Sequence, residues 1–220
     1  MNIGVLGTGQ VGEAIGSALI AKGHSVKMGS RTATNEKAVA WSKKGGKHAS
    51  NGSFDDATAF GETIFLCLNG EFALDAVKSI QPENINGKVV IDITNPLDFT
   101  HGMHPRLLNV FNNSISLGES IQNEIPGAFV VKTLNTVNVK LMVNANEVNG
   151  GDHHLFICGN DADAKNKVMH LLVDNFNWKA GNLIDLGDIT KARTVEAIVP
   201  FWVSVWQALG TPLFNFKIVR

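Results

Sequence analysis

The feature that most constrains this sequence is the glycine pattern "GTGQVG" at residues 7–12. It follows the short apolar run "NIGVL" directly and opens "QVGEAIGSALIAKG", whose apolar residues recur at helical spacing. This order predicts a strand, a tight turn and a helix. In such a unit the first glycine permits the turn, the second lets backbone amides approach a pyrophosphate, and the third lets the helix pack on the strand. The pattern predicts a dinucleotide site formed by Gly7, Thr8, Gly9, Gln10, Val11 and Gly12.

The end of the second predicted strand indicates which dinucleotide fits. An acidic residue usually stands there, where it accepts hydrogen bonds from ribose hydroxyls and repels a 2'-phosphate. This chain carries "GSRT" instead, so Arg31 can bind phosphate through two hydrogen bonds while Ser30 and Thr32 add neutral donors. Lys37 adds charge from the next helix. The sequence therefore predicts NADP rather than NAD; the alternative is that Arg31 and Lys37 are ordinary solvated charges on a loop.

Strands and helices alternate along the rest of the chain. Further strands are predicted at 24–30, 47–49, 62–70, 87–96, 128–138, 153–159 and 182–187, and helices at 35–46, from 54, at 71–80, 161–176 and 189–209. The stretch 97–127 is irregular, with one helical piece at 116–125. The pattern predicts an α/β fold, a Rossmann-type doubly wound parallel sheet extended by C-terminal strands and helices. We expect an NADP-binding Rossmann domain at 1–134 and, at 135–220, a C-terminal extension on the same sheet with a long last helix.

Polar residues follow three of the predicted strands. Since ligands of open parallel sheets lie at the carboxyl ends of strands, these residues are candidates for the nicotinamide side of the site. Asn-Gly and Asn-Pro pairs also form turns, so a purely structural role stays open for the first ones. The candidates are Asn69, Thr94, Asn95, Asn135 and Thr136.

Several types of catalytic site are missing from the sequence. The chain contains no tyrosine, which excludes the tyrosine-lysine proton relay of short-chain dehydrogenases, and no G-x-S-x-G nucleophile elbow. The histidine groups His101/His104 and His153/His154 lack a cysteine or carboxylate at ligand spacing, so we expect no metal site. The catalytic residues are left unassigned.

Composition limits the partners of the chain. A net charge of -1 gives no long-range field to attract nucleic acid or an anionic membrane, so we expect neither as a partner. Only 18% of the residues are charged, which favours some surface hidden between subunits. Cys67 and Cys158 lie in apolar runs and are predicted to be packing residues rather than a disulfide. With no signal peptide or membrane span recognised, we expect a soluble cytoplasmic protein.

With these motifs in hand, the chain resembles the NADP oxidoreductases typified by NADPH:coenzyme F420 reductases, and also the cytosolic domain of the six-transmembrane epithelial ferric reductases. The resemblance rests on "GTGQVG", "GSRT", "VVKTLNTVN" and "ICGNDADAK" followed by "LIDLGDITKARTVE". It implies NADP binding by the glycines with Ser30 and Arg31, hydride exchange with a flavin- or deazaflavin-like acceptor, and a homodimer joined through C-terminal helices. Asn135 stands where the F420 enzymes carry histidine and the ferric reductases asparagine, which leaves the acceptor open.

Hydride transfer from NADPH to a flavin-like ring needs no protein acid in line, since the cofactors supply the chemistry and the protein orients them. The expected partner is therefore a small-molecule hydride acceptor. One alternative is a 3-hydroxyacid or imine reductase, which requires a proton donor, and Lys140 is the candidate. A second alternative is a non-catalytic protein that binds NADP as a sensor.

Overall fold

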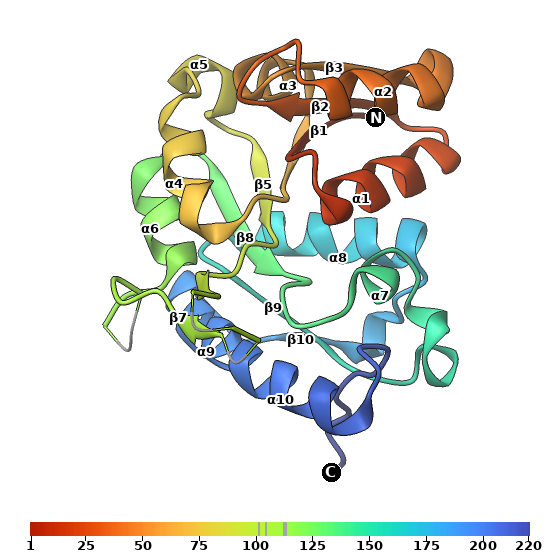
Figure 1. The fold of residues 1–220 in the computed structure, drawn as a ribbon, viewed down its shortest axis with the longest axis vertical. Coiled ribbons are helices and arrows are strands. Elements are labelled where there is room, and N and C mark those ends of the chain that lie inside the picture. The colour runs from red at the N-terminus through yellow and green to blue at the C-terminus, as the bar shows by residue number, and fades with distance from the viewer. Residues whose placement is uncertain (101, 104, 112–113) are drawn as a thin grey trace.

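The computed structural model describes residues 1–100, 102–103, 105–111 and 114–220, which form an α/β fold around an eight-stranded sheet (Figure 1). The sheet contains β1 (Asn2–Leu6), β2 (Ser25–Ser30), β3 (Ala49–Ser53), β4 (Thr63–Leu66), β5 (Val89–Asp92), β8 (Phe129–Thr133), β9 (Leu155–Gly159) and β10 (Leu183–Asp185). Their order across the sheet is β10-β9-β8-β5-β4-β1-β2-β3. Two short strands, β6 (Leu97–Asp98) and β7 (Arg106–Leu107), pair separately. The predicted Rossmann-type fold is confirmed.

Helices cover both faces of the sheet. They are α1 (Gln10–Ala21), α2 (Glu36–Gly45), α3 (Phe54–Phe60), α4 (Gly70–Lys78), α5 (Pro82–Ile85), α6 (Leu117–Glu124), α7 (Val139–Val143), α8 (Ala162–Phe176), α9 (Ala192–Ala197) and α10 (Val199–Leu209). Apolar residues of α1, α2, α7 and α8 form one core, and those of α3, α4, α5, α6 and α9 form the other. Strand β4 contributes side chains to both cores, because Phe65 packs in the first core while Ile64 and Leu66 pack in the second.

The sheet is parallel from β3 to β8 but reverses at β9, which pairs antiparallel with β8. The predicted parallel sheet is thus confirmed from β3 to β8, and the pairing of the C-terminal extension with β8 is the antiparallel exception. A parallel crossover must return the chain to the opposite end of the sheet, whereas α7 has five residues and a length of only about 7.5 Å. The chain therefore re-enters the sheet at the edge where β8 ends. The 15 residues of α8 are long enough for the parallel crossover from β9 to β10.

Two other predicted elements differ from those observed. The third strand covers Ala49–Ser53 rather than 47–49, and the predicted last helix is broken into a 3₁₀ turn at Ile189–Lys191 followed by α9 and α10. Pro200 stands at the start of α10, where its missing N–H and its ring are compatible with a helix beginning but not with a helix interior. The break leaves Trp202 and Trp206 only half-buried while Val199 and Val203 are buried.

The helical piece expected in the irregular stretch is confirmed as α6. Ser116 accepts a hydrogen bond from the Glu119 N–H and the Glu119 carboxylate accepts one from the Ser116 N–H, which is a capping box. Both cysteines are buried free thiols, as predicted, and burial raises the pKa of the Cys158 thiol to about 12. The predicted domain boundary at residue 134 lies at the end of β8 and stays a prediction.

Candidate functional site

The glycine loop between β1 and α1 is held close to the sheet. Gly7 has a φ of 127°, and its N–H donates to the Gly29 carbonyl at 2.9 Å. A Cβ at Gly7 would lie 2.3 Å from the carbonyl oxygen of Cys67, and a Cβ at Gly12 would lie 2.1 Å from the carbonyl oxygen of Gly7. Both positions therefore accept only glycine without a backbone shift.

Gly9 has a different reason for lacking a side chain. It is the N-cap of α1, no side chain caps that helix end, and a Cβ at Gly9 would meet nothing within 4 Å. No side chain therefore occupies the N-terminal end of α1, where the unpaired first-turn N–H groups of a helix and the positive end of its dipole favour an anion. This geometry fits a pyrophosphate lying against the loop.

A cavity of about 860 Å³ opens beside this loop, between the end of β2 and α4. It is lined by Gly7, Thr8, Ser30, Arg31, Asn35, Ser53, Phe54, Asp55, Leu68, Asn69, Phe72, Asp75, Ala76, Ser79 and Gln81. The two halves of the predicted NADP signature, the glycine loop and the arginine segment, therefore lie on one cavity. Its volume is in the usual range for cofactor sites.

Arg31 lies exposed at this cavity with its guanidinium 4.9 Å from the ring centre of Phe72. Within the described parts of the chain it forms no ion pair with a carboxylate. Next to it, the Ser30 hydroxyl donates to the Thr32 carbonyl at 2.7 Å, which fixes the turn. Phe72 was not predicted from the sequence, because an exposed phenylalanine 41 positions away carries no local signal.

Six residues of the glycine loop and the arginine segment do not line this cavity, namely Gly9, Gln10, Val11, Gly12, Thr32 and Lys37. Thr32 is exposed and does not line it. Gln10 and Lys37 line a second, smaller cavity of about 470 Å³ between α1 and α2, together with Thr8 and Gly9. Val11 packs against the first core. The charge of Lys37 thus faces the other side of the glycine loop.

The strand-end residues divide into two groups. Asn69 caps α4 by accepting from the Glu71 N–H at 3.1 Å, and it lines the large cavity. Asn95 and Asn135 instead pair with each other, since the Asn135 amide donates to Asn95 Oδ1 at 2.9 Å and the Asn95 amide donates to the Asn135 carbonyl at 2.8 Å. Thr94 and Thr136 are buried beside this pair and do not line the large cavity.

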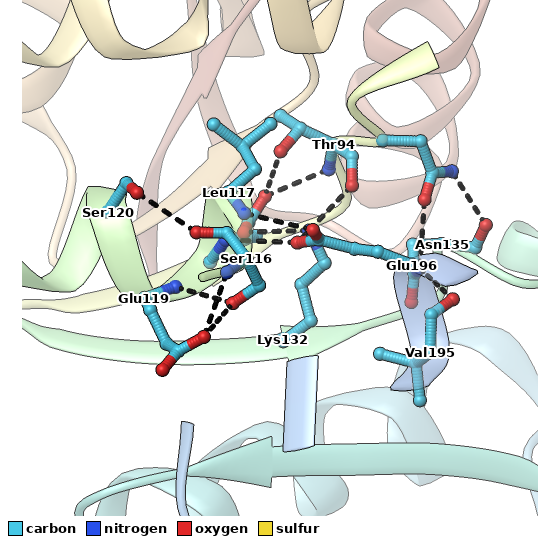
Figure 2. A network of polar contacts seen from close by, with 12 residues as sticks. Thr94, Ser116, Leu117, Glu119, Ser120, Lys132, Asn135, Val195 and Glu196 are labelled. Carbon is cyan, nitrogen blue, oxygen red and sulfur yellow. Dashed lines mark hydrogen bonds and ion pairs between the residues drawn. The ribbon is translucent and has the colours of Figure 1, made fainter. Parts of the chain in front are cut away.

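Below the asparagine pair lies a buried charge cluster (Figure 2). The Lys132 ammonium on β8 is 3.0 Å from Asp92 Oδ2 at the end of β5 and 2.9 Å from Glu196 Oε1 on α9, and all three side chains are at most 2% exposed. It also donates to the Thr94 carbonyl at 2.6 Å. Burial alone would lower the pKa of Lys132, but Asp92 and Glu196 outweigh it and raise that pKa.

A second ion pair supports the same region from outside. Arg193 on α9 forms a bidentate pair with Glu119 on α6. Burial alone would raise the pKa of Glu119, but hydrogen bonds from Arg193 and Ser116 lower it below its ordinary value of 4.5. None of these charged residues was identified from the sequence. A signal exists for two of them, because Asp92 in "VVIDIT" and Lys132 in "FVVKTL" are charged residues within apolar strands.

Other candidate residues are placed away from the cavity. Lys140 is exposed in the first turn of α7 and does not line the large cavity. The His153 ring contacts the Ala145 carbonyl and the Asn215 amide, and His101 and His104 lie outside the described residues. Among the residues that are described, no group of three potential metal ligands occurs. Nor does any helix in those segments have the length and apolar character to cross a membrane.

Comparison with known proteins identifies the relatives of this chain. Residues 2–96 match the family model described as NADP oxidoreductase, coenzyme F420-dependent. The F420-dependent NADP reductase of Methanocaldococcus jannaschii is 30% identical over 224 residues, which covers 96% of each chain. The metalloreductase STEAP3 of Rattus norvegicus is 26% identical over 94% of this chain, which corresponds to 39% of that protein.

Solved structures extend these similarities. A crystal structure from Arthrobacter sp. FB24, provisionally named an F420-dependent NADP reductase, has 44% identity, a TM-score of 0.92 and full coverage of both chains. A reductive aminase from Aspergillus terreus in complex with NADPH has 18% identity and a TM-score of 0.63, over 95% of this chain and 62% of that one. The second likeness concerns the fold alone.

Proposed function

Because this chain belongs to the family of coenzyme F420-dependent NADP oxidoreductases, and is an NADP-dependent oxidoreductase that binds NADP(H), we propose that it transfers a hydride between NADPH and a flavin or deazaflavin acceptor. The observation that carries the proposal is the shared cavity of about 860 Å³, which the glycine loop lines together with Arg31, an arginine that has no carboxylate partner among the described residues. The full-length similarity to an F420-dependent NADP reductase supports the class of acceptor.

Different residues of the cavity bind different parts of NADP(H) in this proposal. The glycine loop and the first turn of α1 receive the pyrophosphate, since no side chain caps this end of α1 and Gly9 leaves room there. Arg31 receives the 2'-phosphate and, among the described residues, has no carboxylate partner to leave, while Ser30 holds the adjacent turn through its hydrogen bond to the Thr32 carbonyl. Asn69 and Leu68 on the α4 side continue the wall toward the strand ends.

The chemistry places few demands on protein acids. When bound, NADPH supplies a hydride that a flavin-type ring accepts, and no proton donor in line with the hydride is required. The tasks of the chain are to orient the two rings and to exclude water. The site agrees with that, because the charged groups nearest the strand ends, Asp92, Lys132 and Glu196, are buried and paired with one another.

The test is NADPH oxidation, followed by absorbance, with FMN, FAD, riboflavin, coenzyme F420 and ferric chelates offered one at a time. The proposal expects turnover with a flavin or with F420, and a strong preference for NADPH over NADH. Turnover only with ferric chelates would place the chain with the metalloreductases in activity. Absence of turnover with any acceptor would overturn the proposal.

We also propose that α10 joins two copies of the chain in a homodimer, which is the subunit arrangement that the family resemblance implies. Phe201 and Leu209 on α10 are 57% and 58% exposed, and Phe201 stacks on Phe216 of the C-terminal segment with ring centres 5.9 Å apart. Large apolar side chains left exposed on one helix are candidates for burial against a second subunit. Light scattering coupled to gel filtration should give twice the mass of the chain, and a mass that stays at one chain across concentrations would contradict it.

A further inference from the structure

The buried charges of Asp92, Lys132 and Glu196, named here the triad, connect four elements at the carboxyl edge of the sheet (Figure 2). Asp92 is the last residue of β5, Lys132 is the last but one of β8, and Glu196 belongs to α9. The Glu196 carboxylate also accepts hydrogen bonds from the N–H groups of Leu117 and Gly118, both at 2.9 Å, in the first turn of α6. Glu196 thereby fixes the position of α9 against both the sheet and α6.

The residue before Glu196 connects this cluster to the asparagine pair. The Val195 carbonyl accepts a hydrogen bond from the Asn135 amide at 2.9 Å, and the same amide group bonds to Asn95 Oδ1. The position of α9 therefore sets the orientation of Asn135, which in turn orients Asn95. All the polar groups in this path are buried or half-buried, so water does not replace a lost contact at low cost.

The backbone before Asn135 is strained. Leu134 is fully buried with a φ of 62°, a left-handed conformation that residues with a Cβ seldom adopt. Strain of this kind persists only where surrounding contacts determine the conformation, and it is concentrated at functional sites. Lys132 of the triad precedes Leu134 by two residues, and Asn135 of the asparagine pair follows it directly.

We propose that Asp92, Lys132 and Glu196 are positioning residues that hold α9 and the Asn95–Asn135 pair as the wall against which the nicotinamide half of NADPH is oriented. The inference rests on the proposed function, because it places that half at the carboxyl ends of β5 and β8, where open parallel sheets bind their ligands. None of the triad residues lines the cavity of Arg31, so we expect the binding of the adenosine half to be unaffected by them.

The test compares Glu196→Gln with Glu119→Gln. Both substitutions remove one carboxylate charge from the contact between α6 and α9, but only Glu196 contacts Lys132. Titration calorimetry would measure the affinity of each variant for NADPH and for 2',5'-ADP, which contains the adenosine half alone. We expect Glu196→Gln to weaken NADPH binding about tenfold and to change 2',5'-ADP binding less than twofold, while Glu119→Gln changes neither more than twofold, whatever it does to the melting temperature.

Asn135→Ala provides the second variant and should reproduce the selective loss of NADPH affinity. The fluorescence of bound NADPH gives an independent readout of the nicotinamide environment, and we expect it to shift in Glu196→Gln and Asn135→Ala only. Equal losses for both ligands, no loss in either variant, or a wild-type protein that binds both ligands equally would overturn the positioning role. A wild-type protein that binds no NADPH would instead overturn the proposed function.

Discussion

The contact between Arg31 and Phe72 makes a prediction about how the protein selects its cofactor. An arginine beside a carboxylate must give up that partner before it binds phosphate, whereas one held over an aromatic ring keeps its full charge available. The guanidinium of Arg31 lies 4.9 Å from the ring centre of Phe72, which is 42% exposed. A cation–π contact at such an exposed site contributes about 0.5 to 1 kcal/mol.

Phe72→Leu keeps an apolar side chain and removes the ring. If the ring positions the guanidinium, NADPH affinity should fall about two- to fivefold, the factor that corresponds to about 0.5 to 1 kcal/mol. NADH affinity should stay unchanged, since NADH has no 2'-phosphate. Phe60→Leu is the matched control. The Lys27 ammonium lies 5.2 Å from the ring centre of Phe60, so this ring also makes a cation–π contact, but Phe60 does not line the cavity.

A double-mutant cycle with Arg31→Gln completes the assay, using fluorescence or calorimetric titration of NADPH and NADH. Arg31→Gln alone should weaken NADPH binding about 10- to 150-fold, the range for a hydrogen bond to a charged group. The added Phe72→Leu should then have no further effect, because the ring acts through Arg31. Equal losses of NADPH and NADH in Phe72→Leu would show that the ring stacks on the adenine instead, and would refute the reasoning.

Three further predictions follow from the site. Gly9→Ala should leave the melting temperature unchanged but weaken NADPH binding, whereas Gly12→Ala should lower both, by about 1 to 3 kcal/mol in stability, because its Cβ meets a backbone oxygen; thermal melts and titrations check this. Lys140→Ala should leave turnover within twofold of wild type, and a large loss would favour the imine-reductase alternative. Glu119 has a lowered pKa, so its ionised form stabilises the fold above about pH 4.5 and that stability is lost as the pH falls through the folded-state pKa. Glu119→Gln should therefore lose less melting temperature than wild type between pH 5 and pH 3.

The sequence predicts the parts of the site that depend on local geometry. The glycine loop and Arg31 lie on one cavity, as expected, because a tight turn and a strand end are determined by a few adjacent residues. The reversal of β9 is related to the short helix α7, and the break before α10 is related to Pro200. Both features could in principle be predicted from the sequence. Helical spacing alone does not reveal either of them.

The parts that escape prediction depend on contacts between distant positions. Lys132 and Glu196 are separated by 64 residues and Arg31 and Phe72 by 41, and no periodicity connects them. The hydrogen bonds of the Asn135 amide to Asn95 and Val195 likewise could not be predicted without knowing where α9 lies in the fold. Predicting such pairs requires knowing which strand ends are neighbours, and the sheet order provides that information.

The most direct test of the account is the ratio of kcat/KM for NADPH to kcat/KM for NADH, measured with one working acceptor in wild type and in Arg31→Asp. The account predicts a wild-type preference for NADPH of at least about tenfold, and its loss or inversion in the variant, where a carboxylate repels the 2'-phosphate and can accept from ribose hydroxyls. Equal use of both cofactors by the wild type, or an equal loss of both in the variant, would contradict it.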